Sequence, residues 1–223
     1  MKINLRDEYA NLDKYLEQVY NKYIKTHKEG EEDSLDDYVL DLKCYCTLAH
    51  AAFEEFIENI CRYSAGEMID NLKNFGRISW CTLCFFSFYV DKFTIKDTDL
   101  ASELPGHKDN VLFKKLLTKA CEAYKNYLQD LNNNHGINIK YLLHLLPAVG
   151  LDIPNDQIKN NSLKKLAESR GIFAHHYSIS GVTRFISLED AKNYVDDVKD
   201  IVNELYENAL RMHYYLYNFS TLK

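Results

Sequence analysis

The chain has 223 residues, of which 46% are hydrophobic and only three are proline, a globular composition that excludes a disordered chain. Its formal charge of −6 excludes a protein built as a general nucleic-acid binder, because no global positive field exists. The sequence begins with charged residues, and its longest nearly uncharged apolar run, residues 80–90, is shorter than the roughly 20 residues that span a bilayer. We therefore expect a cytoplasmic protein with no signal peptide and no membrane partner.

Apolar residues recur at alternating steps of three and four in three long stretches, residues 5–23, 35–63 and 188–219. This spacing keeps one apolar stripe on one face of a helix, so each stretch predicts a long helix packed lengthwise against its neighbours. Ser34 and Ser187 precede the second and third stretches. Each is followed three residues later by an acid, as at a helix N-terminus.

The aromatic-rich segment 80–93 fits either a buried strand or a core helix. Three shorter stretches with helical spacing follow, at residues 109–131, 139–146 and 162–173. Residues 74–79 and 94–107 are the expected loops. The sequence thus predicts an all-α fold, an up-and-down helical bundle with three long helices and several shorter ones, in a single domain over residues 1–223.

The six cysteines are expected to be reduced thiols that pack as small hydrophobic side chains. Cys81 and Cys84 have the CxxC spacing of a zinc or thiol site, which leaves a metal or redox protein as a distant alternative. No second pair of ligands stands at a recognised spacing, and neither His50 nor His107 completes one. We therefore expect no metal and no cofactor.

The motifs of familiar nucleotide-binding and hydrolytic enzymes are missing from the sequence, among them GxxxxGK[ST], GxGxxG, HExxH and GxSxG. One segment differs from the rest in charge. Residues 159–184 hold five lysines or arginines and one acid, Glu168, a local charge of +4 within a chain of −6. Inside this segment a guanidinium, two imidazoles and a phenol lie within eight residues, 170–177.

These groups suit the cleavage of RNA by attack of the 2′-hydroxyl on the adjacent phosphate. The reaction needs a base for the hydroxyl, an acid for the leaving 5′-oxygen, and a cation beside the phosphorus. Histidine titrates near neutrality, whereas arginine stays charged and binds two phosphate oxygens at once. The residues alone also allow a plainer interpretation, a basic helix end that complements the helix dipole.

The spacing of the two strongest candidates, Arg170 and His175, raises a geometric question. Five residues correspond to about 140° around an ideal helix, so the two side chains would not share a face. They would come together if the helix ended near Gly171. A site completed by a second copy of the chain would also remove the difficulty.

Three segments form a recognisable combination. They are the NHGI turn at residues 134–137, the apolar helix that ends at Pro147, and RGIFAH at residues 170–175. The combination resembles the HEPN superfamily of helical nucleases, and most closely its RiboL-PSP-HEPN group. Residues 51–58 resemble the second long helix of these proteins and residues 187–191 the start of the last one. The resemblance is strongest over residues 35–215.

The resemblance implies a metal-independent endoribonuclease that works as a homodimer. Carried over to this chain, Arg170 would hold the scissile phosphate and His175 would handle the proton. Many HEPN proteins have a polar residue directly after the arginine, where this chain has Gly171, but the RiboL-PSP-HEPN pattern accepts glycine. The candidates for further RNA contacts are Lys164, Lys165, His176 and Tyr177.

Members of the superfamily often serve in antiviral defence or toxin–antitoxin systems, where they cut tRNA or other cellular RNA. The expected partners are therefore RNA, with tRNA among the candidates, a second copy of the chain, and an antitoxin or another defence-system protein. The alternative, from a different functional class, is a catalytically inactive helical dimerisation module that binds a partner protein.

Overall fold

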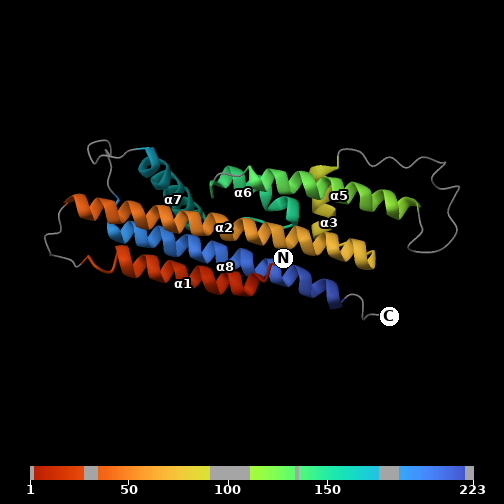
Figure 1. Ribbon diagram of the computed structural model, residues 1–223, viewed down its shortest axis with the longest axis horizontal. Coiled ribbons are helices and arrows are strands. Elements are labelled where there is room, and N and C mark those ends of the chain that lie inside the picture. Colours follow the sequence, from red (N-terminus) through yellow and green to blue (C-terminus); the bar gives the residue numbers. More distant parts are fainter. Residues whose placement is uncertain (1–2, 28–34, 91–110, 134–135, 176–185, 219–223) are drawn as a thin grey trace. The chain divides into compact units, whose positions relative to one another are not determined.

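The computed structural model describes residues 3–27, 35–90, 111–133, 136–175 and 186–218 (Figure 1). The elements are α1 (Leu5–Tyr23), α2 (Leu35–Phe75), α3 (Trp80–Tyr89), α5 (Val111–Asn132), α6 (Ile139–Leu145), the 3-10 helix η1 (Pro147–Val149), α7 (Gln157–His175) and α8 (Leu188–Asn218). All regular structure in these residues is helical, which confirms the predicted all-α fold. At residues 35–36, 111–112, 174–175 and 213–218 the description covers the backbone only.

The three long 3–4 repeats form the helices that they predict. Helix α1 has the expected bounds, and α8 begins at the expected residue. Helix α2 extends beyond the predicted end because its apolar face continues through Ala65, Met68 and Leu72, none of which is exposed. It ends before Gly76, whose φ of +63° is a left-handed conformation that favours glycine after a helix.

Helix α3 resolves the ambiguity over residues 80–93 in favour of a helix. Its first turn closes with a capping box: the Ser79 hydroxyl accepts from the Thr82 backbone N–H at 3.0 Å, and the Thr82 hydroxyl accepts from the Ser79 N–H at 3.0 Å. This reciprocal pair satisfies two donors that a helix start leaves unpaired, which stabilises a helix over a strand. The predicted cap at Ser187 is present, since its hydroxyl accepts from the Asp190 N–H at 2.9 Å. The predicted cap at Ser34 and the loop at 94–107 lie outside the described residues.

Helix α7 is longer than predicted at both ends. It begins at Gln157, five residues early, because the Asp156 carboxylate caps it by accepting from the N–H groups of Ile158 and Lys159 at 2.9 and 3.1 Å. It continues through Gly171 to His175. The helix break near Gly171 that would have brought the candidate arginine and histidine onto one face does not occur.

The chain divides into two compact units, each assembled from three segments distant in sequence. Unit 1 comprises Met1–Asn59, His135–Leu142 and Ile153–Tyr206. Unit 2 comprises Ile60–Asn134, Leu143–Asp152 and Glu207–Lys223. Helices α2 and α8 each contribute residues to both units. Organisation as a single domain stays a prediction.

Unit 1 is held by an apolar core with an aromatic cluster. Tyr9 on α1 stacks on Tyr206 on α8 with ring centroids 4.4 Å apart, and Phe56 on α2 tilts against Tyr9 at 5.7 Å. Such pairs add about 0.5–1.5 kcal/mol each to the stabilisation from burial alone. Lys199 on α8 also bonds Asp13 on α1. These contacts fix the three long elements of unit 1 together.

Unit 2 is held by buried tyrosines. The Tyr127 hydroxyl on α5 donates to the Leu145 carbonyl at 3.0 Å, and its ring meets the Phe85 ring edge-on at 5.3 Å. Tyr89 on α3 donates to the Asp130 carboxylate at 2.7 Å. The abundant tyrosines therefore pack as apolar rings whose hydroxyls find acceptors. Of the described helices, none is long and apolar enough to cross a membrane.

Candidate functional site

Helix α7 places Arg170 just beyond the end of its buried apolar stripe. Leu163 and Leu166 are completely buried, and Arg170 follows them at helical steps of seven and four, so the stripe ends in a charge. The helix is anchored by Ser162, whose buried hydroxyl donates to Asp197 on α8 at 2.5 Å. The buried leucines and this hydrogen bond hold the helix that carries Arg170 within unit 1.

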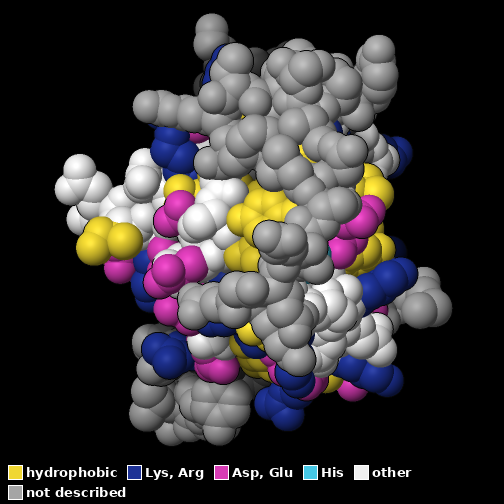
Figure 2. All heavy atoms as spheres, turned by 90° about the vertical axis from the view of Figure 1, so that its left-hand side faces the viewer, with side chains coloured by type: hydrophobic (Ala, Val, Ile, Leu, Met, Phe, Trp, Pro, Cys, Tyr) yellow, Lys and Arg dark blue, Asp and Glu magenta, His cyan; other side chains and the backbone are white. Residues whose placement is uncertain are grey.

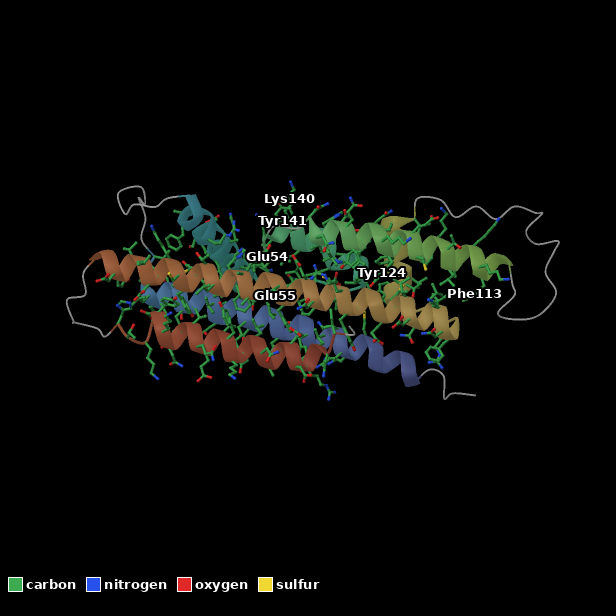
Figure 3. The ribbon with its side chains drawn as sticks, in the orientation of Figure 1. Glu54, Glu55, Phe113, Tyr124, Lys140 and Tyr141 are labelled. Atoms are coloured by element: carbon green, nitrogen blue, oxygen red, sulfur yellow. The ribbon has the colours of Figure 1, made fainter. Side chains whose placement is uncertain are left out.

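Arg170 borders a cavity of about 280 Å³ built from three stretches of unit 1. Helix α2 contributes His50, the turn before α6 contributes Gly136 and Asn138, and α6 contributes Ile139 and Tyr141. Helix α7 contributes Lys164, Ala167, Glu168 and Arg170. Figure 3 marks Lys140 and Tyr141 at the start of α6 and Glu54 on α2. The cavity therefore combines cations, an imidazole, an amide and a phenol.

The charges around the cavity favour an anion at Arg170. Arg170 is exposed, and within the described residues it forms no ion pair. The one acid that lines the cavity, Glu168, is shared between two lysines: its oxygens lie 3.8 Å from Lys164 Nζ and 3.0 Å from Lys165 Nζ. The guanidinium is therefore available for a phosphate, to which its planar fork is suited.

His50 is the histidine of the cavity, and the sequence did not predict it as a site residue. It is only 3% exposed, and Glu54, one turn further along α2, lies 3.7 Å from its Nδ1. Burial, and secondly the charge of Arg170, lower its pKa from 6.5 to about 4, so the ring is neutral at pH 7. A His–Glu pair at i and i+4 is the only signal that its sequence offers, and it is a weak one.

The structure does not describe the side chains of the other three predicted residues that follow Arg170. His175 is the last residue of the helix, and its side chain is not among those described. His176 and Tyr177 lie outside the described residues. Because α7 is continuous from Arg170 to His175, the two positions stand about 140° apart around the helix axis.

A family model for RiboL-PSP-HEPN matches residues 7–209, which is nearly the whole chain. The chain belongs to the RiboL-PSP-HEPN family. The match confirms the resemblance drawn from residues 35–215 and extends it to α1 and to the segment around α3. No curated protein and no solved structure matches the chain.

The lysines of this HEPN domain differ in what they can offer to RNA. Lys164 lines the cavity and is largely exposed. Lys165 does not line the cavity and is paired with Glu168 at 3.0 Å. Lys159 is paired with Asp200 on α8 at 3.0 Å. Figure 2 shows basic and acidic side chains interspersed on the face that it draws. The positive potential is therefore local, and Lys164 and Arg170 supply it at the cavity.

A second cavity of unit 1, of about 260 Å³, has the opposite electrostatic character. It is lined by residues of α1 and α2, and its charged lining residues are Glu8 and Glu55. Figure 3 marks Glu55 on α2. Two carboxylates repel a phosphate chain. Of the two cavities, the one at Arg170 is thus the candidate for binding RNA.

The cysteines of the HEPN chain are free thiols, of which Cys46, Cys61 and Cys81 are buried and the other three half-buried. Expected burial is thus right for three of the six. The Cys81 thiol lies 3.8 Å from the Ser64 carbonyl oxygen, and burial raises its pKa. Among the described residues, no group of three histidines, cysteines or acids is placed to hold a metal ion.

Proposed function

We propose that this protein is an endoribonuclease that cleaves RNA without a metal ion, by attack of the 2′-hydroxyl on the neighbouring phosphate. The observation that carries the proposal is an exposed guanidinium, with no carboxylate partner among the described residues, at the edge of a cavity in a HEPN chain. In this proposal Arg170 binds two oxygens of the scissile phosphate. His175 gives or takes a proton as the bond to the 5′-oxygen breaks.

The proposed substrate contacts extend from Arg170 along α7. Lys164 shares the cavity and would neutralise a neighbouring phosphate. Lys165, His176 and Tyr177 are proposed contacts for the flanking nucleotides, in agreement with their positions in the basic segment of the sequence. The products would carry 2′,3′-cyclic phosphate and 5′-hydroxyl ends, because the substrate supplies its own nucleophile.

We propose that the active form is a homodimer in which the last turns of both α7 helices meet near the two-fold axis. The support is geometric. Within one chain Arg170 and His175 are separated by about 140° around a continuous helix, so they face different directions. A two-fold axis near this helix end would place the histidine of one protomer beside the arginine of the other.

The proposed setting is antiviral defence or a toxin–antitoxin pair in the cytoplasm. The substrate would be tRNA or another cellular RNA, and an antitoxin or another defence protein would be the regulatory partner. The local character of the positive potential supports a selective nuclease, since a chain of −6 has little general affinity for RNA.

The deciding experiment is incubation of total cellular RNA with the purified protein in EDTA, wild type against His175→Ala. We expect the wild type to cut and the variant to lose most of its activity, by about 10²–10⁴-fold, the usual contribution of general acid–base catalysis. Cleavage that stops in EDTA and returns with magnesium would overturn the metal-free mechanism. Wild-type protein that cuts no RNA in either condition would favour the inactive interaction module.

A further inference from the structure

The histidine that shares a cavity with Arg170 within one chain is His50. It comes from α2, a different element from the one that carries the sequence motif. His50 is nearly inaccessible as a residue, yet it forms part of the cavity lining. The part of His50 that lines the cavity is the part that a molecule bound beside Arg170 would contact.

Two contacts define which edge of the His50 ring is available. On one side the Glu54 carboxylate lies 3.7 Å from Nδ1, from the next turn of the same helix. On the other side lies Gly136, where a Cβ would stand 3.4 Å from Nε2, so the lack of a side chain at this position leaves space beside that nitrogen. A carboxylate behind Nδ1 favours the tautomer with a proton on that nitrogen, which leaves the Nε2 lone pair as the acceptor.

The charge state of His50 is set first by its burial and then by the charge of Arg170. The other titratable groups near it are Glu54 on α2, which lies 3.7 Å away, and the cavity residues Tyr141 on α6 and Lys164 and Glu168 on α7. Burial and the Arg170 charge keep its pKa near 4 in the free protein, so the ring begins neutral. A phosphate bound at Arg170 would offset that positive charge, the second of the two causes, and so raise the pKa of His50. A group that is neutral before binding and more basic after it has the properties of a general base.

In the proposed reaction only one proton-transfer group, His175, has been assigned, so a second group is needed. Cleavage by 2′-hydroxyl attack needs one group to remove a proton and another to supply one. We infer that His50 is a catalytic residue of this site, which accepts the 2′-hydroxyl proton at Nε2 while His175 protonates the leaving oxygen. The inference rests on the proposed ribonuclease function.

The 2′-oxygen forms a bond to phosphorus as its proton passes to His50 Nε2. The bond between phosphorus and the 5′-oxygen breaks, its electron pair stays on that oxygen, and protonated His175 supplies the proton. A 2′,3′-cyclic phosphate and a free 5′-hydroxyl result, and water returns the two histidines to their starting states.

The test compares His50→Gln with His175→Ala on randomised RNA oligonucleotides and on the same RNA with sulfur in place of the bridging 5′-oxygen. A thiolate leaves without a proton, so the sulfur substrate needs the base but not the acid. We expect His50→Gln to lower kcat by about 10²–10⁴-fold on both substrates. The His175→Ala variant should recover most of its activity on the sulfur substrate alone. The wild-type kcat should also decrease toward acidic pH, because protonated His50 cannot accept a proton. The kcat of His50→Gln should not show this decrease.

The matched control is His27→Gln, which removes a half-buried histidine of unit 1 that is also paired with a carboxylate. His27 Nε2 lies 3.0 Å from Asp41, and neither residue lines the cavity at Arg170. The activity of His27→Gln should equal that of the wild type.

A His50→Gln protein that folds and cuts as fast as wild type would overturn the inference and leave the proposed function standing. Recovery of the His50→Gln activity on the sulfur substrate would show that His50 acts as the acid. That result would also overturn the inference. Wild-type protein without any RNA cleavage would contradict the proposed function itself.

Discussion

Gly136 packs directly against the His50 ring, although 86 positions separate the two residues in the sequence. A Cβ at position 136 would lie 3.3 Å from the ring carbon Cε1, closer than ordinary van der Waals contact. The φ angle of Gly136 is +118°, a conformation that other residues rarely adopt. Gly136 therefore limits the space beside the His50 ring.

The Gly136→Ala substitution should damage both stability and cleavage. The added methyl group strains the backbone and presses on His50, so we expect the free energy of unfolding to fall by about 1–3 kcal/mol. The kcat for RNA should fall as well, because the ring must shift. Urea unfolding and steady-state cleavage measure the two effects. Gly66→Ala is the control: its nearest neighbour is the Tyr124 hydroxyl at 3.9 Å, and inside α2 it should stabilise by up to about 1 kcal/mol. Equal stability of the two variants would contradict the packing described.

The low pKa of His50 predicts an acid-sensitive fold. In the unfolded chain the imidazole has a pKa near 6.5, whereas in the folded protein it is about 4. Between these values the unfolded state binds a proton that the folded state does not, so stability falls as the pH falls through this window. The contribution is about 3 kcal/mol, from about 1.4 kcal/mol for each unit of pKa difference.

The measurement is urea unfolding at several pH values between 7 and 4, for wild type and His50→Gln. Acidic residues titrate in the same range in both proteins, so the difference between the two curves isolates the histidine. The wild type should lose more stability than the variant. Parallel curves would mean that His50 is not held neutral by burial.

The helices were largely predictable because the apolar spacing is local information. The repeats of α1 and α8 are sustained over many turns and contain few breaks. The starts of these helices are marked by residues close in sequence. The early start of α7 was missed because its cap is a single acid, Asp156, in a segment without apolar periodicity. Helix α3 was ambiguous because it is apolar all round and shows no helical or alternating pattern.

The candidate site was only half predictable for a physical reason. Arg170 stands out through charge within a basic segment, which one stretch of sequence can reveal. His50 lies beside an apolar stripe of α2, and its relation to Arg170 and Gly136 exists only after the chain has folded. The spacing from Arg170 to His175 was correctly seen as awkward for one chain, and the unbroken α7 sharpens that difficulty.

Arg170→Lys should impair cleavage although it keeps the positive charge. Lysine lacks the planar fork that donates two parallel hydrogen bonds to a phosphate. Losing one such charge-assisted bond costs about 1.5–3 kcal/mol, so kcat/KM should fall by about tenfold to a hundredfold. Lys159→Met is the control, because Lys159 is paired with Asp200 outside the cavity. A lysine variant as active as wild type would show that Arg170 acts only as a point charge.

The dimer proposal predicts that two inactive variants restore each other. If Arg170 of one protomer works with His175 of the other, a mixed dimer of Arg170→Ala and His175→Ala chains contains one site in which both residues are intact. Equal mixing with free exchange of protomers should then recover about a quarter of the wild-type rate, since half of the dimers are mixed and each has one of its two sites working. Sites formed within single chains would give no recovery, because every chain in the mixture lacks one of the two residues.

Cleavage of labelled RNA before and after unfolding and refolding the mixture measures the difference, and each variant refolded alone is the control. Inactivity of the refolded mixture, with mixed dimers present by native mass spectrometry, would contradict a site shared between protomers.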